Sequence, residues 1–374
     1  MMNQKILTGI NHLAETLEGA KKVFLVCDSS YHFLSIKDDI EEMGVPHVMF
    51  SDFTPNPLYE QVCKGIDLFQ ITKCDTILAV GGGSAIDVAK CIKLAVLAKE
   101  GNAAIIPPLV NKRVECDRAK LPFIAIPTTA GTGSESTHNA VMYYEGVKQT
   151  VTNDGVLPDI AILEPKVLKT LPLYQKKCTM MDALCQGIES WWSVNSTEES
   201  YEYSRKTIEF IMTNWRKYIF ENDENTAAQI MLGANYGGRA INITATTAAH
   251  AMSYKITSLY KLPHGHAVAV CLPEIWEYMI SHMDKCLDKR GQEYLSGIFN
   301  DIAKAIGCDT PVQAIALFRQ MLIDMKLQNP TSYINQRASD ISLLTSSVNP
   351  IRLKNNPVEL DEIAIQSLYY SIVK

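Results

Sequence analysis

The chain has 374 residues, a length that exceeds the usual limit for one hydrophobic core and therefore predicts two domains. Hydrophobic residues make up 47% of the chain and charged residues 20%, with no low-complexity tract, which excludes a disordered protein. The net charge of −6 and the pI near 5.8 argue against binding to nucleic acids or anionic membranes.

The N-terminal segment is interrupted by polar residues, and no apolar run approaches the roughly 18 residues that span a bilayer. We therefore expect a cytoplasmic protein. Ten cysteines are spread from Cys27 to Cys308 without a CxxC pair, a pattern typical of buried free thiols in a reducing compartment.

The first half of the chain alternates short apolar runs with helical stretches. Strands are expected at 22–27, 46–52, 75–80 and 122–127, and further short strands at VMYY, TVTN and DIAILEP. Apolar strands that alternate with helices predict a parallel sheet covered on both faces.

Beyond Leu171 the strand signals stop, and long helical patterns follow at 176–194, 198–218 and 226–260, with several more up to 374. The sequence therefore predicts an α/β domain of residues 1–172 and an all-α domain of residues 173–374, and Pro172 supports the break. A cleft between two domains is the first place to expect an active site.

The run ILAVGGGSAIDVAK, residues 77–90, passes from a strand through three glycines into a helix that opens at Ser84. Glycines allow the backbone to approach a phosphate, and the N–H groups of a helix start favour its negative charge. The run lacks the GxGxxG pattern and follows the third expected strand, so it does not indicate an ordinary Rossmann unit. A plain strand–helix turn is the alternative interpretation.

A second loop, IPTTAGTGSEST at residues 126–137, directly follows another strand. Its small residues can pack against a pyrophosphate or a nicotinamide ring, and the hydroxyl groups of Thr128, Thr129, Thr132 and Thr137 can form hydrogen bonds. Two such loops at adjacent strand ends predict a dinucleotide site.

A third motif, DALCQ at residues 182–186, places Asp182 and Gln186 one turn apart on one face of a helix. A carboxylate and an imidazole at this spacing would form half of a metal site. An uncharged amide binds divalent metals weakly, so the glutamine needs an explanation.

Together, GGGSAIDVAK, PTTAGTGSE and PHG resemble the iron-containing, group III alcohol dehydrogenases over about residues 15–290. The resemblance implies the dehydroquinate synthase-like fold, with an N-terminal Rossmann-like α/β domain for the dinucleotide and an all-α C-terminal domain. It also implies NAD(P)-dependent interconversion of an alcohol and an aldehyde, and a homodimer or a larger homo-oligomer.

On this resemblance, the four threonines and Lys148 contact the nicotinamide half of the cofactor, and the pyrophosphate is held by Gly82, Gly83, Ser84 and Asp87. Asp28, at the end of the first expected strand, matches a position that faces the adenosine ribose. A carboxylate there would repel a 2′-phosphate, which favours NAD over NADP. Without the resemblance, Asp28 would be interpreted as a turn residue.

Members of this family bind a divalent metal, here expected to be Fe²⁺ or Zn²⁺, through one aspartate and three histidines. Asp182, His250 and His264 match three of these positions, and Gln186 occupies the fourth. Three interpretations are open: Gln186 is a weak ligand, His266 supplies the missing nitrogen, or the site holds little metal and Gln186 bonds the substrate.

Tyr254 stands one turn after His250, where many relatives carry a histidine, and it can relay a proton or form a wall of the pocket. The region around DALCQ and residues 237–267 is most similar to the phosphonoacetaldehyde reductase branch, whose members make 2-hydroxyethylphosphonate. Arg239 and Lys255 are candidates to bind this dianion, and Arg239 shares a face with His250 if the helix over 226–260 is unbroken.

Three alternatives to this substrate or activity remain at the level of the sequence. A general aliphatic aldehyde or alcohol is the alternative substrate. A lyase of the dehydroquinate synthase type, which would regenerate its NAD, and a non-catalytic NAD-binding relic are the alternatives from other classes.

Overall fold

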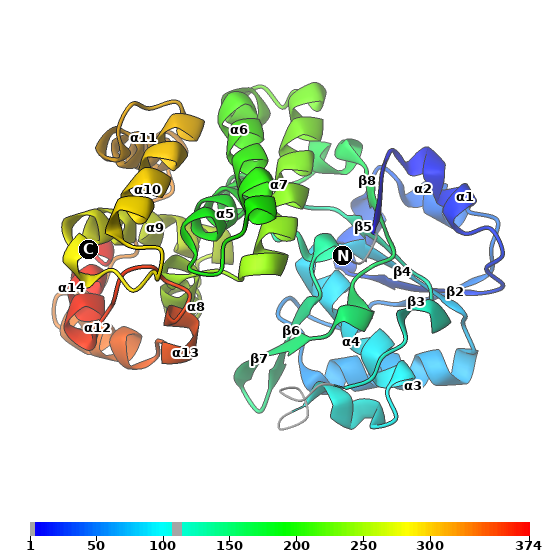
Figure 1. Ribbon diagram of the computed structural model, residues 1–374. Coiled ribbons are helices and arrows are strands. Elements are labelled where there is room, and N and C mark those ends of the chain that lie inside the picture. The colour runs from blue at the N-terminus through cyan, green and yellow to red at the C-terminus, as the bar shows by residue number, and fades with distance from the viewer. Residues whose placement is uncertain (1–3, 107–113) are drawn as a thin grey trace. The chain divides into compact units, whose positions relative to one another are not determined.

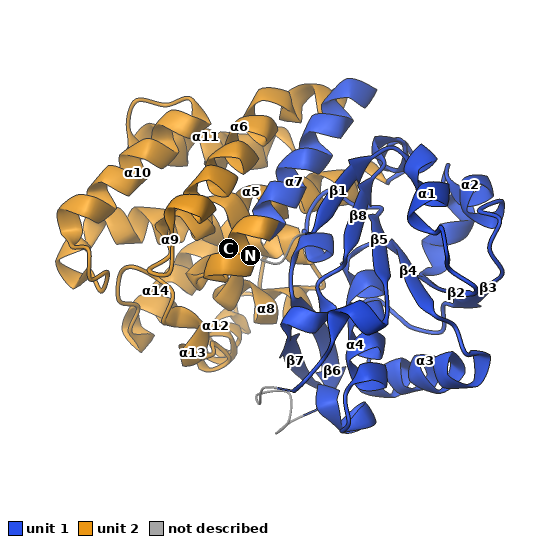
Figure 2. Ribbon diagram, turned by 45° about the vertical axis from the view of Figure 1, so that its right-hand side comes forward, with its two compact units in different colours: residues 1–171, 222–238 blue, residues 172–221, 239–374 orange. Residues whose placement is uncertain are grey.

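The computed structural model of the protein describes residues 4–106 and 114–374 (Figure 1). The chain divides into two compact units, residues 1–171 with 222–238 and residues 172–221 with 239–374 (Figure 2). The second unit starts at Pro172, and the sequence analysis places the domain boundary after this residue. Residues 222–238, however, group with the first unit, although the sequence assigns them to the second domain.

The first unit is built on a sheet of six strands in the order β1-β8-β5-β4-β2-β3, in which every pair is parallel (Figure 1). The strands are β1 (Lys5–Thr8), β2 (Val23–Cys27), β3 (His47–Phe50), β4 (Thr76–Gly81), β5 (Phe123–Pro127) and β8 (Ile160–Leu163). The parallel sheet was predicted correctly, except that the sequence analysis missed β1.

Both faces of this sheet are covered, because all five residues of β2 are buried. Phe24 and Val26 belong to one apolar cluster with Ile66 of α3 and Ile86 of α4, while Leu25 points to the other face and is equally buried. The helices of this unit that precede residue 171 are α1 (Leu13–Thr16), α2 (Lys37–Glu41), α3 (Tyr59–Thr72) and α4 (Gly83–Leu97).

Two of the expected strands do not join the main sheet. They pair with each other as an antiparallel hairpin of β6 (Asn139–Tyr144) and β7 (Val147–Thr152). Glu145 and Gly146 between them have φ values of 50° and 74°, as a two-residue hairpin turn requires.

The second unit is helical, as predicted. Its helices are α5 (Leu173–Trp192), α6 (Glu198–Phe220), α8 (Ala248–Tyr260), α9 (His264–Ser281), α10 (Gln292–Ile306), α11 (Pro311–Asp324), α12 (Arg337–Ser346), α13 (Pro350–Leu353) and α14 (Glu362–Ile372). Trp192 of α5 packs edge-to-face on Trp276 of α9, with 5.6 Å between the ring centroids, and this contact lies in the core of the unit.

The single helix expected over residues 226–260 is wrong. Three residues separate the end of helix α7 (Glu224–Thr244) from the start of α8. The first of them, Ala245, has a φ of 56°, which no residue within an α-helix adopts. Arg239 and His250 therefore belong to different helices, and the argument that they share one helical face fails. No helix in the described part of the chain is long and apolar enough to cross a membrane.

Candidate active site

The carboxyl ends of three neighbouring strands carry the residues predicted to bind a dinucleotide. Strand β2 pairs with β4, and β4 pairs with β5, so Asp28, the glycine turn and Thr128 follow strands that lie side by side. Strand β3 lies on one side of β2 and β4 on the other, which makes the gap between β2 and β4 a point where the strand order reverses. Ligands of open α/β sheets bind at this kind of position.

The glycine turn brings the start of α4 close to the second loop. Gly82 is the N-cap of α4 and has no side chain that could accept a hydrogen bond from the first turn. The N–H groups of this turn can therefore bind a negatively charged ligand. A Cβ on Gly83 would lie 3.0 Å from Thr132, which is tighter than ordinary contact. A side chain at position 83 would therefore require the Thr132 side chain to shift by a few tenths of an ångström. Ser84 accepts a hydrogen bond from the backbone of Asn56 at 3.3 Å.

A buried lysine that the sequence analysis did not single out joins the two loops. The Nζ of Lys90 donates to the carbonyl and hydroxyl of Ser134 at 2.5 and 3.0 Å, to the Thr137 hydroxyl at 3.0 Å and to the Asn139 carbonyl at 2.7 Å. Burial lowers the pKa of Lys90 to about 8, against the opposing effect of nearby carboxylates. The sequence indicated that Lys90 could be buried, because this lysine ends the motif GGGSAIDVAK and its neighbours are mostly apolar.

Asp87 and Thr137 take part in this internal network. Asp87 accepts hydrogen bonds from the Ser134 hydroxyl at 2.6 Å and from the Val141 N–H at 3.0 Å. Through these hydrogen bonds, the two side chains attach the second loop to α4, which is a structural role. Their direct contact with a cofactor stays a prediction.

The other predicted cofactor residues surround the same strand ends. The N–H of Thr128 donates to the Gly81 carbonyl at 3.0 Å, and Thr129 is half-buried beside Gly82. Asp28 begins a short helical turn and accepts from the Ser30 N–H at 2.8 Å, and its carboxylate adjoins Gly81. Lys148 lies on β7, close enough to Asp87 to act on its charge.

Three helices of the second unit bring Asp182, His250 and His264 together. Asp182 comes from α5, His250 from α8 and His264 from the first residue of α9, and their ligand atoms lie within 4.8 Å of one another. The Nε2 of His250 is 3.2 Å from Oδ1 of Asp182. Two imidazoles and one carboxylate form a donor set suited to a divalent metal such as Fe²⁺ or Zn²⁺, so these residues fit the expected ion.

Gly265 explains how the histidine of the PHG motif reaches the aspartate. A Cβ on Gly265 would lie 2.0 Å from the carbonyl oxygen of Cys178 and 2.9 Å from the Cβ of Asp182, so only glycine allows α9 to start this close to α5. The motif therefore combines a candidate ligand, His264, with the glycine that positions it.

Glu189 is the main residue of this site that the sequence analysis missed. It is fully buried on α5, and its Oε1 accepts from the N–H groups of Thr247 at 3.1 Å, Ala249 at 3.0 Å and His250 at 3.3 Å, at the start of α8. Its Oε2 contacts Nδ1 of His250. The carboxylate thus holds the start of α8 and the imidazole together, which leaves Nε2 of His250 directed at Asp182.

The carboxylates also set the charge of His250. Burial alone lowers the pKa of this imidazole, but Glu189 and Asp182 outweigh burial and raise it to about 9. The sequence contained a signal for Glu189. It lies seven residues after Asp182, which places both carboxylates on the same face of one helix, two turns apart.

Gln186 is buried on α5, one turn after Asp182. The interpretation in which His266 supplies the missing nitrogen is wrong. Nδ1 of His266 is 2.8 Å from the Tyr174 hydroxyl and Nε2 is 2.8 Å from the Gln328 carbonyl oxygen, so both ring nitrogens are used elsewhere.

Tyr254 contacts one of the three candidate ligands, His264. Its ring stacks on that of His264 with 5.6 Å between the centroids and 11° between the planes. Nη1 of Arg352, from α13, donates to the Tyr254 hydroxyl at 3.3 Å. Burial raises the pKa of this phenol, and Arg352 opposes part of the rise, so the phenol carries its proton at neutral pH.

The two predicted substrate cations lie in other surroundings. The guanidinium of Arg239 is 5.7 Å from the ring centroid of Tyr203 on α6. Lys255 is half-buried on α8, next to Tyr254 in the chain. Binding of the substrate by either side chain stays a prediction.

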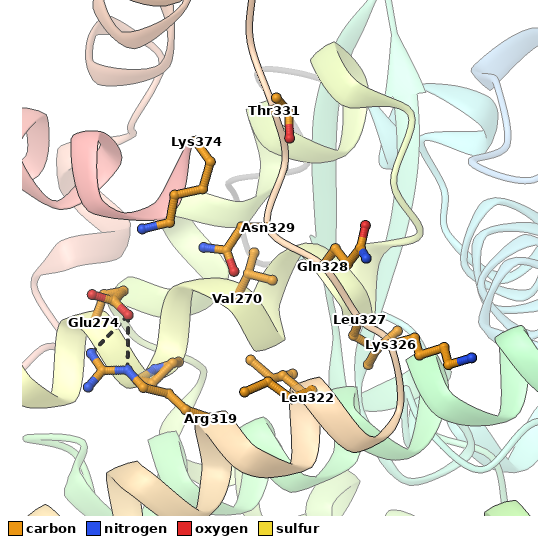
Figure 3. Close-up of a pocket in the computed structure, with 12 residues that line it drawn as sticks. Val270, Glu274, Arg319, Leu322, Lys326, Leu327, Gln328, Asn329, Thr331 and Lys374 are labelled. Carbon is orange, nitrogen blue, oxygen red and sulfur yellow. Dashed lines mark hydrogen bonds and ion pairs between the residues drawn. The ribbon is translucent and has the colours of Figure 1, made fainter.

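A separate pocket of about 600 Å³ lies in the second unit, between α9, α11 and the segment after α11 (Figure 3). Figure 3 shows Arg319 directed at Glu274, and the two are 2.9 Å apart. None of Asp182, Gln186, His250 and His264 lines this pocket. It is therefore distinct from the candidate metal centre.

Comparison with known families decides the class of this site. Residues 3–165 match the family model of the iron-containing alcohol dehydrogenases, and residues 177–373 match that of the C-terminal region of the Fe-containing alcohol dehydrogenase family. The chain belongs to the iron-containing alcohol dehydrogenase family. It is therefore an alcohol dehydrogenase or aldehyde reductase, as the resemblance implied.

Relatives within the iron-containing alcohol dehydrogenases carry several different names. The chain is 30% identical over 312 residues to a phosphonoacetaldehyde reductase of Streptomyces viridochromogenes, covering 79% of this chain and 75% of that protein. It is 27% identical to long-chain-alcohol dehydrogenase 1 of Geobacillus thermodenitrificans, covering 94% and 89%. The fold matches that of a sulfoacetaldehyde reductase of Bifidobacterium kashiwanohense in complex with NAD⁺, with a TM-score of 0.88, 23% identity, and coverage of 100% and 97%.

Proposed function

We propose that this iron-containing alcohol dehydrogenase uses NADH to reduce a small aldehyde, with phosphonoacetaldehyde as the best-supported substrate and 2-hydroxyethylphosphonate as its product. The observation that carries the proposal is the buried cluster of Asp182, His250 and His264. A cluster of this composition suits electrophilic activation of a carbonyl group.

Asp182, His250 and His264 would hold the metal, and we propose Fe²⁺ because two histidines and one carboxylate are a typical ligand set for non-haem iron. A bound divalent ion supplies a Lewis acid that stabilises negative charge on the carbonyl oxygen. Gln186 would be a neutral fourth ligand. This assignment would explain the DALCQ motif, because one carboxylate and two imidazoles can hold a divalent ion without a third histidine.

The reaction consumes one aldehyde, one NADH and one proton, and it yields the alcohol and NAD⁺. Hydride is added to the carbonyl carbon, so a proton must reach the oxygen. We assign this proton to Tyr254, whose hydroxyl oxygen accepts a hydrogen bond from Arg352 and whose raised pKa keeps the phenol protonated.

On the cofactor side, the start of α4 would accept the pyrophosphate, and Asp28 would accept hydrogen bonds from the adenosine ribose. The preference for NAD over NADP rests on the negative charge of Asp28. The four threonines and Lys148 are assigned to the nicotinamide half.

The names of relatives give the substrate proposal its direction. One relative is named for phosphonoacetaldehyde and one neighbour in fold for sulfoacetaldehyde, and both of these compounds are two-carbon aldehydes that carry an acid group. The long-chain-alcohol dehydrogenase at 27% identity keeps a neutral aliphatic aldehyde as the second candidate.

A panel of aldehydes tests the proposal. The iron-loaded protein is assayed for NADH oxidation with phosphonoacetaldehyde, succinic semialdehyde, lactaldehyde and butyraldehyde, and we expect the highest kcat/KM for phosphonoacetaldehyde. A large preference for butyraldehyde would refute the substrate assignment. A turnover without net NADH consumption would indicate a lyase, and inactivity with every aldehyde and with Fe²⁺ or Zn²⁺ would indicate a relic.

A cytoplasmic location and a homodimeric or larger assembly stay predictions. Fractionation of cells and light scattering of the purified protein test them separately from the activity.

A further inference from the structure

The hydroxyl group of Thr247 lies between two buried side chains of α5. The indole N–H of Trp192 donates to this hydroxyl oxygen at 2.9 Å, and the hydroxyl donates to Oε1 of Glu189 at 2.7 Å. All three residues belong to the second unit, and each of them is at most 1% exposed. The Thr247 hydroxyl therefore connects the end of α5 with the carboxylate that holds His250.

The donor and acceptor types fix the direction of each hydrogen bond in this chain. An indole nitrogen can only donate, and a carboxylate oxygen can only accept. The Thr247 oxygen therefore accepts from Trp192, and its single proton is left for Glu189. The other oxygen of Glu189 accepts from Nδ1 of His250, which keeps one imidazole proton on Nδ1 and directs Nε2 toward Asp182. This is the arrangement that a metal ligand needs, because the ion must bind the nitrogen that gives up its proton.

Thr247 is used differently from an ordinary helix cap. It is the N-cap of α8, a position where a threonine side chain usually accepts from the N–H groups of its own first turn. Here the N–H groups of Ala249 and His250 donate to Oε1 of Glu189, together with the N–H and the hydroxyl of Thr247 itself. Four donors on one oxygen fix the orientation of the carboxylate, and this orientation places Oε2 at the imidazole.

We infer that Thr247 is a positioning residue for the metal centre: its hydroxyl, oriented by Trp192, fixes the Glu189 carboxylate, which in turn fixes the His250 imidazole. The inference rests on the metal site of the proposed function and is independent of the proposed substrate. An ion that binds to an imidazole already held in place does not bear the cost of ordering it. Loss of the hydroxyl should therefore lower the affinity for the metal.

The variants Thr247→Val and Thr247→Ser test the inference by competition for iron with a chromophoric chelator. Valine keeps the shape of the side chain without the hydroxyl, whereas serine keeps the hydroxyl. We expect Thr247→Val to weaken iron binding by about 5- to 30-fold, somewhat less than the loss for a direct partner of a ligating histidine. Thr247→Ser should bind iron as the wild type does.

Thr345→Val is the matched control. The buried hydroxyl of Thr345 donates to the Ile341 carbonyl at 2.8 Å, and both residues belong to α12 of the second unit. This variant therefore loses a buried threonine hydrogen bond away from Glu189, and it should keep the iron affinity of the wild type.

A second measurement needs no metal. In the metal-free protein with isotopically labelled histidine, the proton on Nδ1 of His250 should give a slowly exchanging NMR signal, because it is buried and bound to Glu189. This signal should shift in Thr247→Val and keep its wild-type position in Thr247→Ser and Thr345→Val. Trp192→Phe, which removes the indole N–H, should shift the same signal, so the inference stays testable if Thr247→Val does not fold.

Two results would overturn the inference. One is an unchanged iron affinity in a Thr247→Val protein whose circular dichroism matches that of the wild type, and the other is an unchanged His250 signal. Equal losses of affinity in Thr247→Val and Thr345→Val would also leave the hydroxyl with a packing role only. Failure of the wild type to bind iron would refute the proposed metal site instead, and the His250 signal would still report on Thr247.

Discussion

Replacing Gly265 with alanine should disable the metal centre without unfolding the protein. The added Cβ would lie 2.0 Å from the Cys178 carbonyl oxygen, and real contacts of this kind are not shorter than 3.0 Å. The start of α9 must therefore move by about 1 Å away from α5, because the Cys178 carbonyl belongs to the packed backbone of α5 and cannot rotate away. Gly265 has no left-handed φ, so the effect comes from crowding alone.

This displacement is large on the scale of metal coordination. His264 precedes Gly265 and would move with it, whereas ligand distances tolerate only about 0.2 Å. We expect metal affinity to fall by at least about 100-fold, with a loss of stability of about 1–3 kcal/mol from overpacking. Iron binding is measured by competition with a chromophoric chelator, and folding is followed by circular dichroism.

Gly297→Ala is the control for this prediction. Gly297 is exposed within α10, nothing lies within 4 Å of its added Cβ, and alanine there should stabilise the helix by about 0.5–1 kcal/mol without any effect on iron. If Gly265→Ala bound iron within threefold of the wild type, the close approach of α9 to α5 would not be what positions His264.

Four other changes test the remaining assignments. Glu189→Gln should weaken iron binding by about 10- to 100-fold, because the amide no longer fixes the proton on Nδ1 of His250; an unchanged chelator competition would contradict this. Tyr254→Phe should lower kcat by about 100-fold at unchanged iron content, and a loss below threefold would make the ring a pocket wall. Asp28→Asn should raise the ratio of kcat/KM for NADPH to that for NADH by roughly tenfold, and a constant ratio would remove Asp28 from the ribose site. For Lys90, burial lowers the pKa from 10.5 to about 8, so the unfolded chain holds the proton more tightly between these pH values. The free energy of unfolding of the wild type should therefore rise relative to Lys90→Met by up to about 3 kcal/mol from pH 8 to 10.5 in urea titrations, and a flat or falling difference would contradict the assignment.

The parallel sheet could be predicted because its central strands are continuous apolar runs that end at glycine, proline or polar residues. Strand β1 escaped prediction because it has four residues, none of them buried, and gains its order by pairing with β8, more than 150 residues away. The assignment of residues 222–238 to the first unit is also a tertiary effect. Asn235, for example, donates to Glu135 at 3.0 Å across 100 residues of chain.

The end of α7 was missed for a different reason. Residues 239–250 contain no proline or glycine, and their apolar periodicity continues through Ala245, so no local signal marks the break. The break is fixed by distant groups instead. Glu189 accepts the N–H of Thr247, and Trp192 donates to the Thr247 hydroxyl at 2.9 Å.

The cluster of Asp182, His250 and His264 could be anticipated from the family resemblance, because the motifs DALCQ and PHG each contribute one of its members. Arg352 could not, because it lies in a polar segment, NPIRLKNN, whose composition is typical of a solvated loop. Its position became apparent only when α13 was seen to pack on α8.

The two oxygens of Glu189 have a consequence for how the proposed metal site is loaded. One oxygen accepts hydrogen bonds from the N–H groups of the first turn of α8, and the other contacts the His250 imidazole. Folding of α8 onto Glu189 therefore orients His250 toward Asp182 before any metal binds. Removal and replacement of the ion should therefore proceed on a folded scaffold. Cobalt could be exchanged into the chelated protein as a spectroscopic probe without a refolding step.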